Sequence, residues 1–283
     1  MATSIDLTSL ANVKAYLGIT DTSSDTILQR FLTAMSSAFL AEVSRAIVLQ
    51  TYVDTFNGSD PRVRIAPALS PYPGAVTYGT DGFAGVGYRG YAINLEQYPV
   101  QSVTSVVIDG TTIPQRPDVN SDGWVLEDQR RIELVGYRFT PNVQNCIVTY
   151  TAGFQTSDSA TIPGTPYQVQ TQYLFTSDVS VTIAGVAATK VASAPATGQY
   201  SVSSTGLYTF AAADAGKAAV VTYGYIPGDI EEAVIEMVAL RHRERDRVGQ
   251  ISATHGGETV QFIRDAWPAM VQQTIDKYAR INI

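Results

Sequence analysis

The spacing of apolar residues changes twice along this 283-residue chain, and those changes constrain its fold more than any other feature. Up to about residue 46 apolar side chains recur every three or four positions, which is typical of amphipathic helices. From Ile47 the pattern alternates, or breaks into short β-branched runs between turn residues, as in antiparallel strands. Helical spacing returns after Pro227. The chain is therefore predicted to be an α+β protein with its helices at the two ends.

Two helices are predicted in the first part of the chain. One runs from about Thr8 to Leu17, and Gly18 follows where a left-handed C-cap glycine is expected. After a polar turn, Asp25 can cap the second helix. The apolar face of this second helix is wider than is usual for a helix exposed to solvent on one side, so the helix should be largely buried. The face comprises Ile27, Leu28, Phe31, Leu32, Met35, Phe39 and Val43.

Short strands are predicted between the helical ends, and together they indicate a small antiparallel β layer. Asn57-Gly58 and Asp109-Gly110 supply turns. The segment 59–90 is rich in Gly, Pro and Tyr, and a loop of this length is usually functional or disordered. Its Tyr- and Gly-rich part, Tyr72 to Tyr91, is either a plain surface loop or a contact to a neighbouring copy or a tail component. The strand candidates are 48–56, 103–108, 124–126, 131–134 and 146–150.

The segment 155–225 has almost no charged residues and is dominated by Ala, Ser, Thr, Val and Gly. Its short strand-like runs predict a separate all-β module of the sandwich type. Val148-Thr149-Tyr150, just before this module, recurs near its end as Val221-Thr222-Tyr223. The repetition fits either a duplicated strand or a tripeptide common in strands, and we interpret it as a coincidence.

The last part of the chain returns to helical spacing. Asp229, with Glu232 three residues later, is typical of a helix start, and Gly249 is the expected end of that helix. A polar connection follows. A final helix is predicted from near Pro268, a residue that suits a first turn, through Tyr278.

Composition and charge exclude several functions. The net charge of −7 argues against a general nucleic-acid binder, which needs a surplus of Lys and Arg. Cys146 is the only cysteine, so no intrachain disulfide is possible, which fits a reducing compartment. The segment from Met1 to Leu17 lacks the pattern of a signal peptide, and no apolar run is long enough to span a bilayer. We therefore expect assembly in the cytoplasm and no membrane partner.

The sequence does not favour an enzyme. His242 and His255 are the only histidines, and neither accompanies a nucleophile-elbow motif. One cysteine and two histidines at this spacing do not form a zinc motif. Asp109-Gly110 and Asp122-Gly123 lack the ligand pattern of a calcium loop, and the glycines of 82–87 lack a Walker lysine. We expect no catalytic residue, no metal and no cofactor.

Five short motifs resemble, in order and spacing, those of bacteriophage head-tail connector (adaptor) proteins of the long-tailed phage neck. The first two are the LANVKAYLGI run of residues 10–19 and the helix ending in VSRAI at 43–47. Next come YPVQSV at 98–103 and YTAGF at 150–154. The fifth is IPGDIEEA at 226–233. The resemblance covers about 7–154 and 226–283, and departs from the family at 59–90 and 155–225.

The resemblance implies a discontinuous adaptor domain, 1–154 with 226–283, with a mainly α-helical core, into which the β module 155–225 is inserted. It also implies a structural virion protein of the neck that forms a ring, typically a dodecamer, beneath the portal protein. The ring would join the capsid to a further neck or tail protein, and double-stranded DNA would pass through its lumen during genome ejection. The alternative interpretation is a virion-surface protein that binds a glycan or a host through 155–225.

Two groups of residues are candidate contacts. The charged run 241–247 is either a solvated helix end or a set of intersubunit ion pairs, and interfaces are enriched in arginine. Its candidates are Arg241, Arg243, Arg245 and Arg247. The family's C-terminal segment reaches the portal, and aromatic residues dominate binding hot spots. The resemblance therefore suggests a portal anchor, rather than core packing, for Phe262, Ile263, Trp267 and Tyr278.

Overall fold

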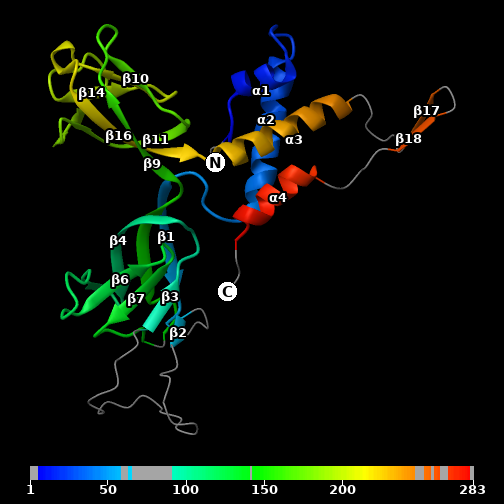
Figure 1. Cartoon of the computed structure of the whole chain (residues 1–283). Helices are drawn as coiled ribbons and strands as arrows, with labels where there is room; N and C mark the ends of the chain where they lie inside the picture. The colour runs from blue at the N-terminus through cyan, green and yellow to red at the C-terminus, as the bar shows by residue number, and fades with distance from the viewer. Residues whose placement is uncertain are drawn as a thin grey trace. The chain divides into compact units, whose positions relative to one another are not determined.

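The structure is a computed structural model, and its elements are labelled in Figure 1. It describes residues 6–58, 63–65, 91–140, 142–245, 252–255, 258–261 and 267–280. The chain divides into two compact units. One unit comprises Met1–Val48 with Phe154–Asn282, and the other comprises Leu49–Gly153.

Four helices lie within the described residues: α1 (Leu10–Leu17), α2 (Asp25–Val43), α3 (Gly228–Glu244) and α4 (Ala269–Tyr278). The Ser9 side chain caps α1 by accepting the Asn12 N–H at 3.1 Å, and Gly18 ends the helix in a left-handed conformation, φ 69°. Ser24 takes the cap position of α2, one residue before the predicted Asp25. The predicted helix positions are therefore accurate to within a residue or two, except that α3 is described only as far as Glu244.

The helices from the two ends of the chain share one apolar core. Every helix contributes to it, although about 180 residues separate α2 from α3 in the sequence. The wide apolar face of α2 is buried here, as its pattern predicts. The fully or largely buried members include Val13, Leu28, Leu32, Phe39, Val43, Ile230, Val234, Met237, Val238, Val271 and Ile275.

Residues 49–153, the first β domain, form two four-stranded sheets. One sheet has the order β1-β8-β4-β5, and the other has the order β2-β3-β7-β6. Alternate residues of the strands are buried, as in sheets that have one face on a core. The strands are β1 (Gln50–Phe56), β2 (Val63–Ile65), β3 (Tyr91–Asn94), β4 (Val100–Ile108), β5 (Thr111–Ile113), β6 (Gly123–Glu127), β7 (Arg131–Val135) and β8 (Cys146–Ala152).

Residues 154–226, the second β domain, also form two four-stranded sheets, with the orders β12-β11-β16-β9 and β10-β15-β14-β13. One core contains side chains from both sheets, including Val181 and Tyr223 from the first and Tyr208 from the second. The strands are β9 (Gln155–Thr161), β10 (Gln168–Gln170), β11 (Leu174–Ile183), β12 (Val186–Ala187), β13 (Thr189–Lys190), β14 (Gln199–Val202), β15 (Leu207–Phe210) and β16 (Ala218–Ile226).

The second β domain repeats the strand pairing of the first. The order β1-β8-β4-β5 corresponds to β9-β16-β11-β12, and β3-β7-β6 corresponds to β10-β15-β14. The β4–β8 pair has two register shifts, and the β11–β16 pair has two shifts at the corresponding places. The turn after β4, Asp109-Gly110 with φ 49° and 78°, recurs after β11 as Ala184-Gly185 with φ 49° and 80°. Irregularities of this kind are specific features of a fold, so the two domains share one architecture.

The repeated tripeptide lies at the same place in both domains. Val148 pairs with Asp54 of β1, and Val221 pairs with Asp158 of β9. The tyrosine two residues later is fully buried in each case. The two Val-Thr-Tyr runs are therefore structurally equivalent, and our interpretation of the repetition as a coincidence is wrong.

The expected mainly α-helical core with a small β layer is also wrong. Within the described ranges strands occupy more residues than helices, and they form four four-stranded sheets. The prediction treated each short strand separately, whereas pairing between distant strands decides how many sheets form. The insertion of 155–225 into an adaptor domain of 1–154 and 226–283 stays a prediction. That segment lies in the same compact unit as the helices.

Two strands between α3 and α4 form a hairpin of their own. β17 (Ser252–His255) pairs in antiparallel fashion with β18 (Glu258–Gln261), and no third strand joins them among the described residues. None of the described helices combines the length and the apolar character that crossing a membrane requires.

Candidate interaction site

The start of α3 and the end of α4 meet at Asp229. The Tyr278 hydroxyl donates to both carboxylate oxygens of Asp229, at 2.9 and 3.0 Å, and Lys277 Nζ lies 2.6 Å from Oδ2. Asp229 stands in the first turn of α3, where a negative charge is favoured by the helix dipole. One carboxylate therefore fastens the last described helix to the first turn of α3.

The charge on Asp229 is stabilised by these partners. Burial acts in the opposite direction, but the bonds from Lys277 and Tyr278, with the positive charge of Lys277, hold the pKa of Asp229 below its ordinary value. The same contact raises the pKa of Lys277. Asp229 thus stays ionised, and its bonds with α4 keep their charge-assisted character, at neutral and mildly acidic pH.

Arg45 stacks on two aromatic rings beside this contact. Its guanidinium carbon lies 5.5 Å from the ring centroid of Phe154 and 5.5 Å from that of Tyr278. The two rings also meet edge to face, with 5.7 Å between their centroids. The backbone N–H of Arg280 donates to the Val43 carbonyl at 2.8 Å, which ties the chain after α4 to the end of α2.

The four candidate portal anchor residues do not form one exposed group among the described residues. Tyr278 is buried in the helical core and its hydroxyl is bound to Asp229. Trp267 is half-buried and packs against the same core. Phe262 and Ile263 lie outside the described residues. The structure thus brings Trp267 and Tyr278 to one core, and their contact with a portal stays a prediction.

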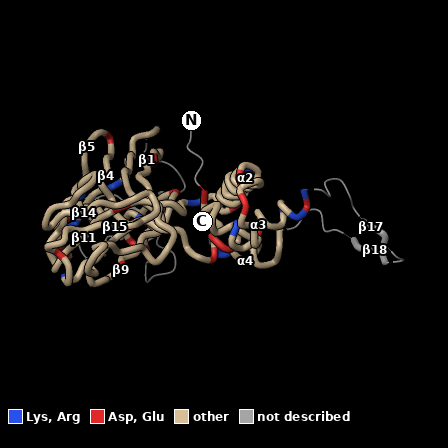
Figure 2. Tube along the Cα trace, turned by 90° about the horizontal axis from the view of Figure 1, so that it is seen from above, with Lys and Arg blue, Asp and Glu red and all other residues tan. Residues whose placement is uncertain are grey.

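The arginines at the end of α3 are on the surface. Arg241, Arg243 and Arg245 are exposed, and Arg245 lies 3.4 Å from the His242 ring nitrogen. Within the described part of the chain, neither Arg241 nor Arg243 has an ion-pair partner. Figure 2 shows basic positions, with an acidic position between them, at this end of α3. Arg247 lies outside the described residues, as does most of the segment 59–90.

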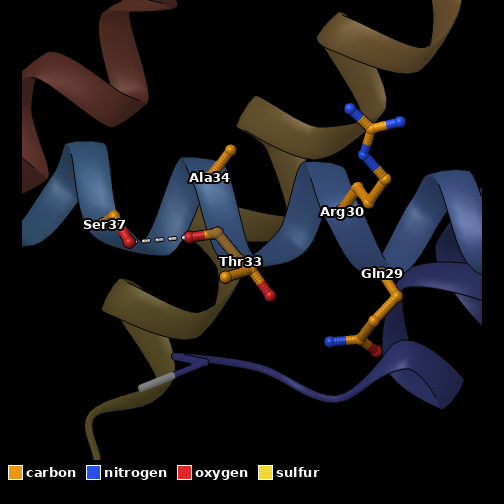
Figure 3. A pocket seen from close by; sticks show the side chains of 5 residues that line it. All are labelled: Gln29, Arg30, Thr33, Ala34 and Ser37. Carbon is orange, nitrogen blue, oxygen red and sulfur yellow. Dashed lines mark hydrogen bonds between the residues drawn. The ribbon is translucent and has the colours of Figure 1, made fainter. Parts of the chain in front are cut away.

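A shallow hollow of about 400 Å³ lies along α2 and is lined by Gln29, Arg30, Thr33, Ala34 and Ser37 (Figure 3). Three of its polar side chains already have partners. Gln29 and Thr33 donate to the two carboxylate oxygens of Asp6, at 2.6 and 2.8 Å, and Ser37 donates to the Thr33 carbonyl. The lining includes two hydroxyl groups but no histidine, carboxylate or lysine that could activate them, and all five residues lie on α2.

Potential ligands for metals are scattered. Across the described ranges, no three His, Cys, Asp or Glu side chains come together in a way that could hold a metal ion. Cys146 is buried, and burial raises the pKa of its thiol to about 11, so the thiolate is scarce at neutral pH.

Sequence reasoning missed the Asp229, Arg45 and Phe154 contacts. Asp229 is separated from Tyr278 by 49 positions and Arg45 is farther still from Phe154, so no local pattern links them. The sequence pattern predicted a helix start at Asp229, but the N-cap of α3 is Pro227 and Asp229 lies in the first turn. No sequence pattern predicted the bonds of Asp229 with Lys277 and Tyr278 of α4.

No protein-family model matches the sequence, and no curated protein matches it. Among solved structures, the chain is similar to one in the neck of an empty GTA particle computed with C6 symmetry. That match has 13% identity and a TM-score of 0.45, and covers 100% of this chain and 95% of the other. A chain in the neck of a native GTA particle computed with C12 symmetry gives 14% identity, a TM-score of 0.41, and coverage of 97% and 89%. A chain in the virion of a native gene transfer agent (GTA) particle gives 12% identity, a TM-score of 0.42, and coverage of 100% and 95%. Identities and TM-scores this low assign neither a family nor a function to this chain.

Proposed function

We propose that this protein is a structural subunit of the neck of a phage-like particle. Copies of the chain form a ring that binds the portal protein on one side and a further neck or tail protein on the other. Double-stranded DNA passes through the ring without sequence-specific contacts. The ring acts as a mechanical adaptor in the virion, assembles in the host cytoplasm, and turns over no substrate.

The positions of the family-like motifs support this proposal. The run 10–19 forms α1 and its glycine cap, and the motif at 98–103 leads into β4. The motif at 150–154 covers the end of β8, and that at 226–233 begins α3. A chance set of motifs would not be expected to fall at element boundaries in the order that the resemblance implies.

One observation carries the proposal: the family-like segments at the two ends of the chain form one helical bundle. α1 and α2 come from the start of the chain and α3 and α4 from its end, and they bury a common apolar core. The β segment between them that the resemblance leaves unexplained, 155–225, completes its own core. The bundle implied by the resemblance can therefore exist as a unit within this longer chain.

The charge pattern is compatible with the proposed role. A net charge of −7 lets DNA pass nearby without strong adhesion. The exposed arginines at the end of α3 offer positive groups to the acidic surface of a neighbouring copy or of the portal.

The proposal is tested by mixing the purified chain with the portal ring of its own particle. Size-exclusion chromatography with light scattering then gives the mass of the product. We expect a saturable increase equal to one chain per portal subunit. Two species that elute separately, with the chain folded, would contradict the proposal. A chain truncated after Val248 is the matched variant, and it should lose portal binding. Because the truncation also removes the buried side chains of α4, circular dichroism first checks that the rest of the chain is folded.

The alternative, a glycan- or host-binding protein that uses 155–225, gains no support from the surface of that segment. A glycan site usually presents several aromatic side chains, because they combine an apolar face with a polar tip. Among the described residues of 155–225, Tyr173 is the one exposed large aromatic, at 40%. The other tyrosines of the second β domain are buried or half-buried.

A further inference from the structure

The two β domains differ at one sheet edge. In the first domain β2 covers the outer edge of β3, and Arg64 pairs with Ala92 at the centre of that contact. β3 then pairs with β7, and the order of the sheet is β2-β3-β7-β6. This edge of the fold can therefore accept an additional antiparallel strand.

The equivalent edge of the second domain has no such strand. β10 corresponds to β3, because Gln168, Val169 and Gln170 pair with β15 as Ala92, Ile93 and Asn94 pair with β7. In the second domain the sheet order starts at β10, and no strand among the described residues covers its outer edge. Thr171 N–H donates to the Gly206 carbonyl as Leu95 N–H donates to the Arg130 carbonyl. Equivalent residues of β10 and β3 therefore bond to the neighbouring strand of their own sheet.

The backbone of β10 offers donors and acceptors on its open side. Tyr167 and Thr171 bond to β15, so by alternation the N–H and C=O groups of Gln168 and Gln170 point away from it. Natural edge strands are usually protected by charged residues, proline or a bulge. The three residues of β10 include neither a charge nor a proline. An edge of this kind is suited to pairing with another strand.

A strand that needs a partner exists in the same chain. β17 and β18 form a two-stranded hairpin, and such a hairpin is marginally stable in water without a third strand. β18 contains two successive β-branched residues, Thr259 and Val260, which favour strand pairing. In the ring of the proposed function, on which this step rests, each copy has neighbouring copies that carry the same hairpin.

We propose that β10 is an acceptor edge for strand β18 of a second copy of this chain. The added hairpin takes the place on β10 that β2 takes on β3. This contact would link neighbouring copies by backbone hydrogen bonds, and it goes beyond the portal contact of the proposed function. It needs copies of the chain to meet but does not need the portal to be present.

Cysteine crosslinking tests the contact between copies directly. One preparation carries Gln170→Cys, a second carries Thr259→Cys, and a third carries Val260→Cys, because successive side chains of a strand point to opposite faces. The first preparation is mixed with each of the others at several concentrations and oxidised. Each preparation is also oxidised alone, and the dimer band on a non-reducing gel that exceeds those of the separate preparations measures the heterodimers. We expect one of the two mixtures to give heterodimers in a yield that rises with concentration.

The duplication supplies a matched control. Asn94→Cys places the thiol at the equivalent position of β3, directly after Ile93, which pairs with Val63 of β2. Its heterodimer yield should be several-fold lower than that of Gln170→Cys. Equal yields would overturn the proposal. A disulfide within one chain of the Gln170→Cys/Thr259→Cys double variant, without heterodimers in the mixtures, would also overturn it.

The result is separable from the test of the proposed function. Portal binding without heterodimers would contradict the proposed β10 contact and would support the neck role. Heterodimers without portal binding would support the β10 contact and would contradict the neck role.

Discussion

Each β domain has one tyrosine whose hydroxyl group is held on two sides. Tyr150 donates to Asp54 and Tyr223 donates to Asp158, both at 2.6 Å. Each hydroxyl also accepts a backbone N–H, from Gln97 at 3.0 Å and from Tyr173 at 3.3 Å. The two aspartates accept one more backbone N–H each, from Glu96 and Gln172.

Burial, and then the bond to the aspartate, raises the pKa of Tyr150 and of Tyr223. The two tyrosines therefore connect their strands as neutral donors up to strongly alkaline pH.

Removal of either hydroxyl should destabilise the domain that contains it. Tyr150→Phe leaves the Gln97 N–H without an acceptor and takes one donor from Asp54, at a cost of about 1–3 kcal/mol in the free energy of unfolding. Hydrogen exchange should show faster opening of β8 for Tyr150→Phe, and of β16 for Tyr223→Phe. Tyr137→Phe, at a ring that is 37% exposed, is the control and should change stability by less than about 0.5 kcal/mol. Equal effects on both domains from one substitution would contradict separate domain cores.

At the scale of elements, α4 is short and its attachment depends on few contacts. Val271, Ile275 and Tyr278 are its buried residues, and Asp229 of α3 receives its polar contacts. The ion pair with Lys277 is largely exposed, so water and salt screen it and it contributes little to the attachment. The Tyr278 bonds and the buried side chains therefore provide most of the attachment.

Asp229→Asn should release α4 more often while the rest of the bundle stays folded. The pKa of Asp229 is lowered in the folded chain, so the attachment it provides is complete above the ordinary carboxylate value of about 3.9 and is lost as pH falls through the lowered value. In the native chain, hydrogen exchange of α4 should accelerate below about pH 4, and in Asp229→Asn it should already be fast at pH 7. Asp276→Asn, an exposed carboxylate on the same helix, is the control. Similar exchange in both variants would show that Asp229 does not hold α4.

The end of α3 presents arginines that the fold does not need. Arg241 and Arg243 are exposed, so the double substitution Arg241→Glu/Arg243→Glu should change the free energy of unfolding by less than about 0.5 kcal/mol per site. If these side chains contact a neighbouring copy, charge reversal should reduce the amount of chain bound to the portal ring, as measured by light scattering. Arg30→Glu, at an exposed position of α2, should leave binding unchanged. Undiminished binding by the double variant would contradict the contact and would support the interpretation that these arginines are a solvated helix end.

At the scale of the whole molecule, the sequence predicted the helices well and the sheets poorly. The apolar spacing of α2 and the glycine after α1 are local signals, and each specifies its own element. The number of sheets depends on which strands pair, and that choice involves residues far apart in the chain. The architecture shared by the two β domains was visible in the sequence as a tripeptide, as the aspartates Asp54 and Asp158 that pair with it, and as matching residues in β4, β11 and the turns after them. These matches are Ser102 with Ser177, Ser105 with Ser180, Val106 with Val181, Ile108 with Ile183, and Gly110 with Gly185.

The candidate site was predictable to a similar extent. The basic end of α3 and its exposure follow from the charge pattern. The burial of Tyr278 does not, because an aromatic residue on a short helix is equally suited to a core or to an interface until its partners are known. The open edge of β10 could be recognised only by comparison with β3, and that comparison requires the register of both domains.

Two successive domains with the same strand order also create a sorting problem during folding. A pairing of β1 with β16 in the same register would bring Asp54 to Tyr223 and would allow the same bond from the tyrosine hydroxyl to the carboxylate as the native pairing with β8. Domains form from the N-terminus onward as a chain is synthesised, and misassembly between neighbours is a characteristic failure of repeated domains. β8 leaves the ribosome before β16 exists, so β1 is already paired when its competitor arrives. The order of translation thus resolves an ambiguity that the side chains of the tripeptide leave open, and a full-length chain that refolds from denaturant has to resolve it without that help.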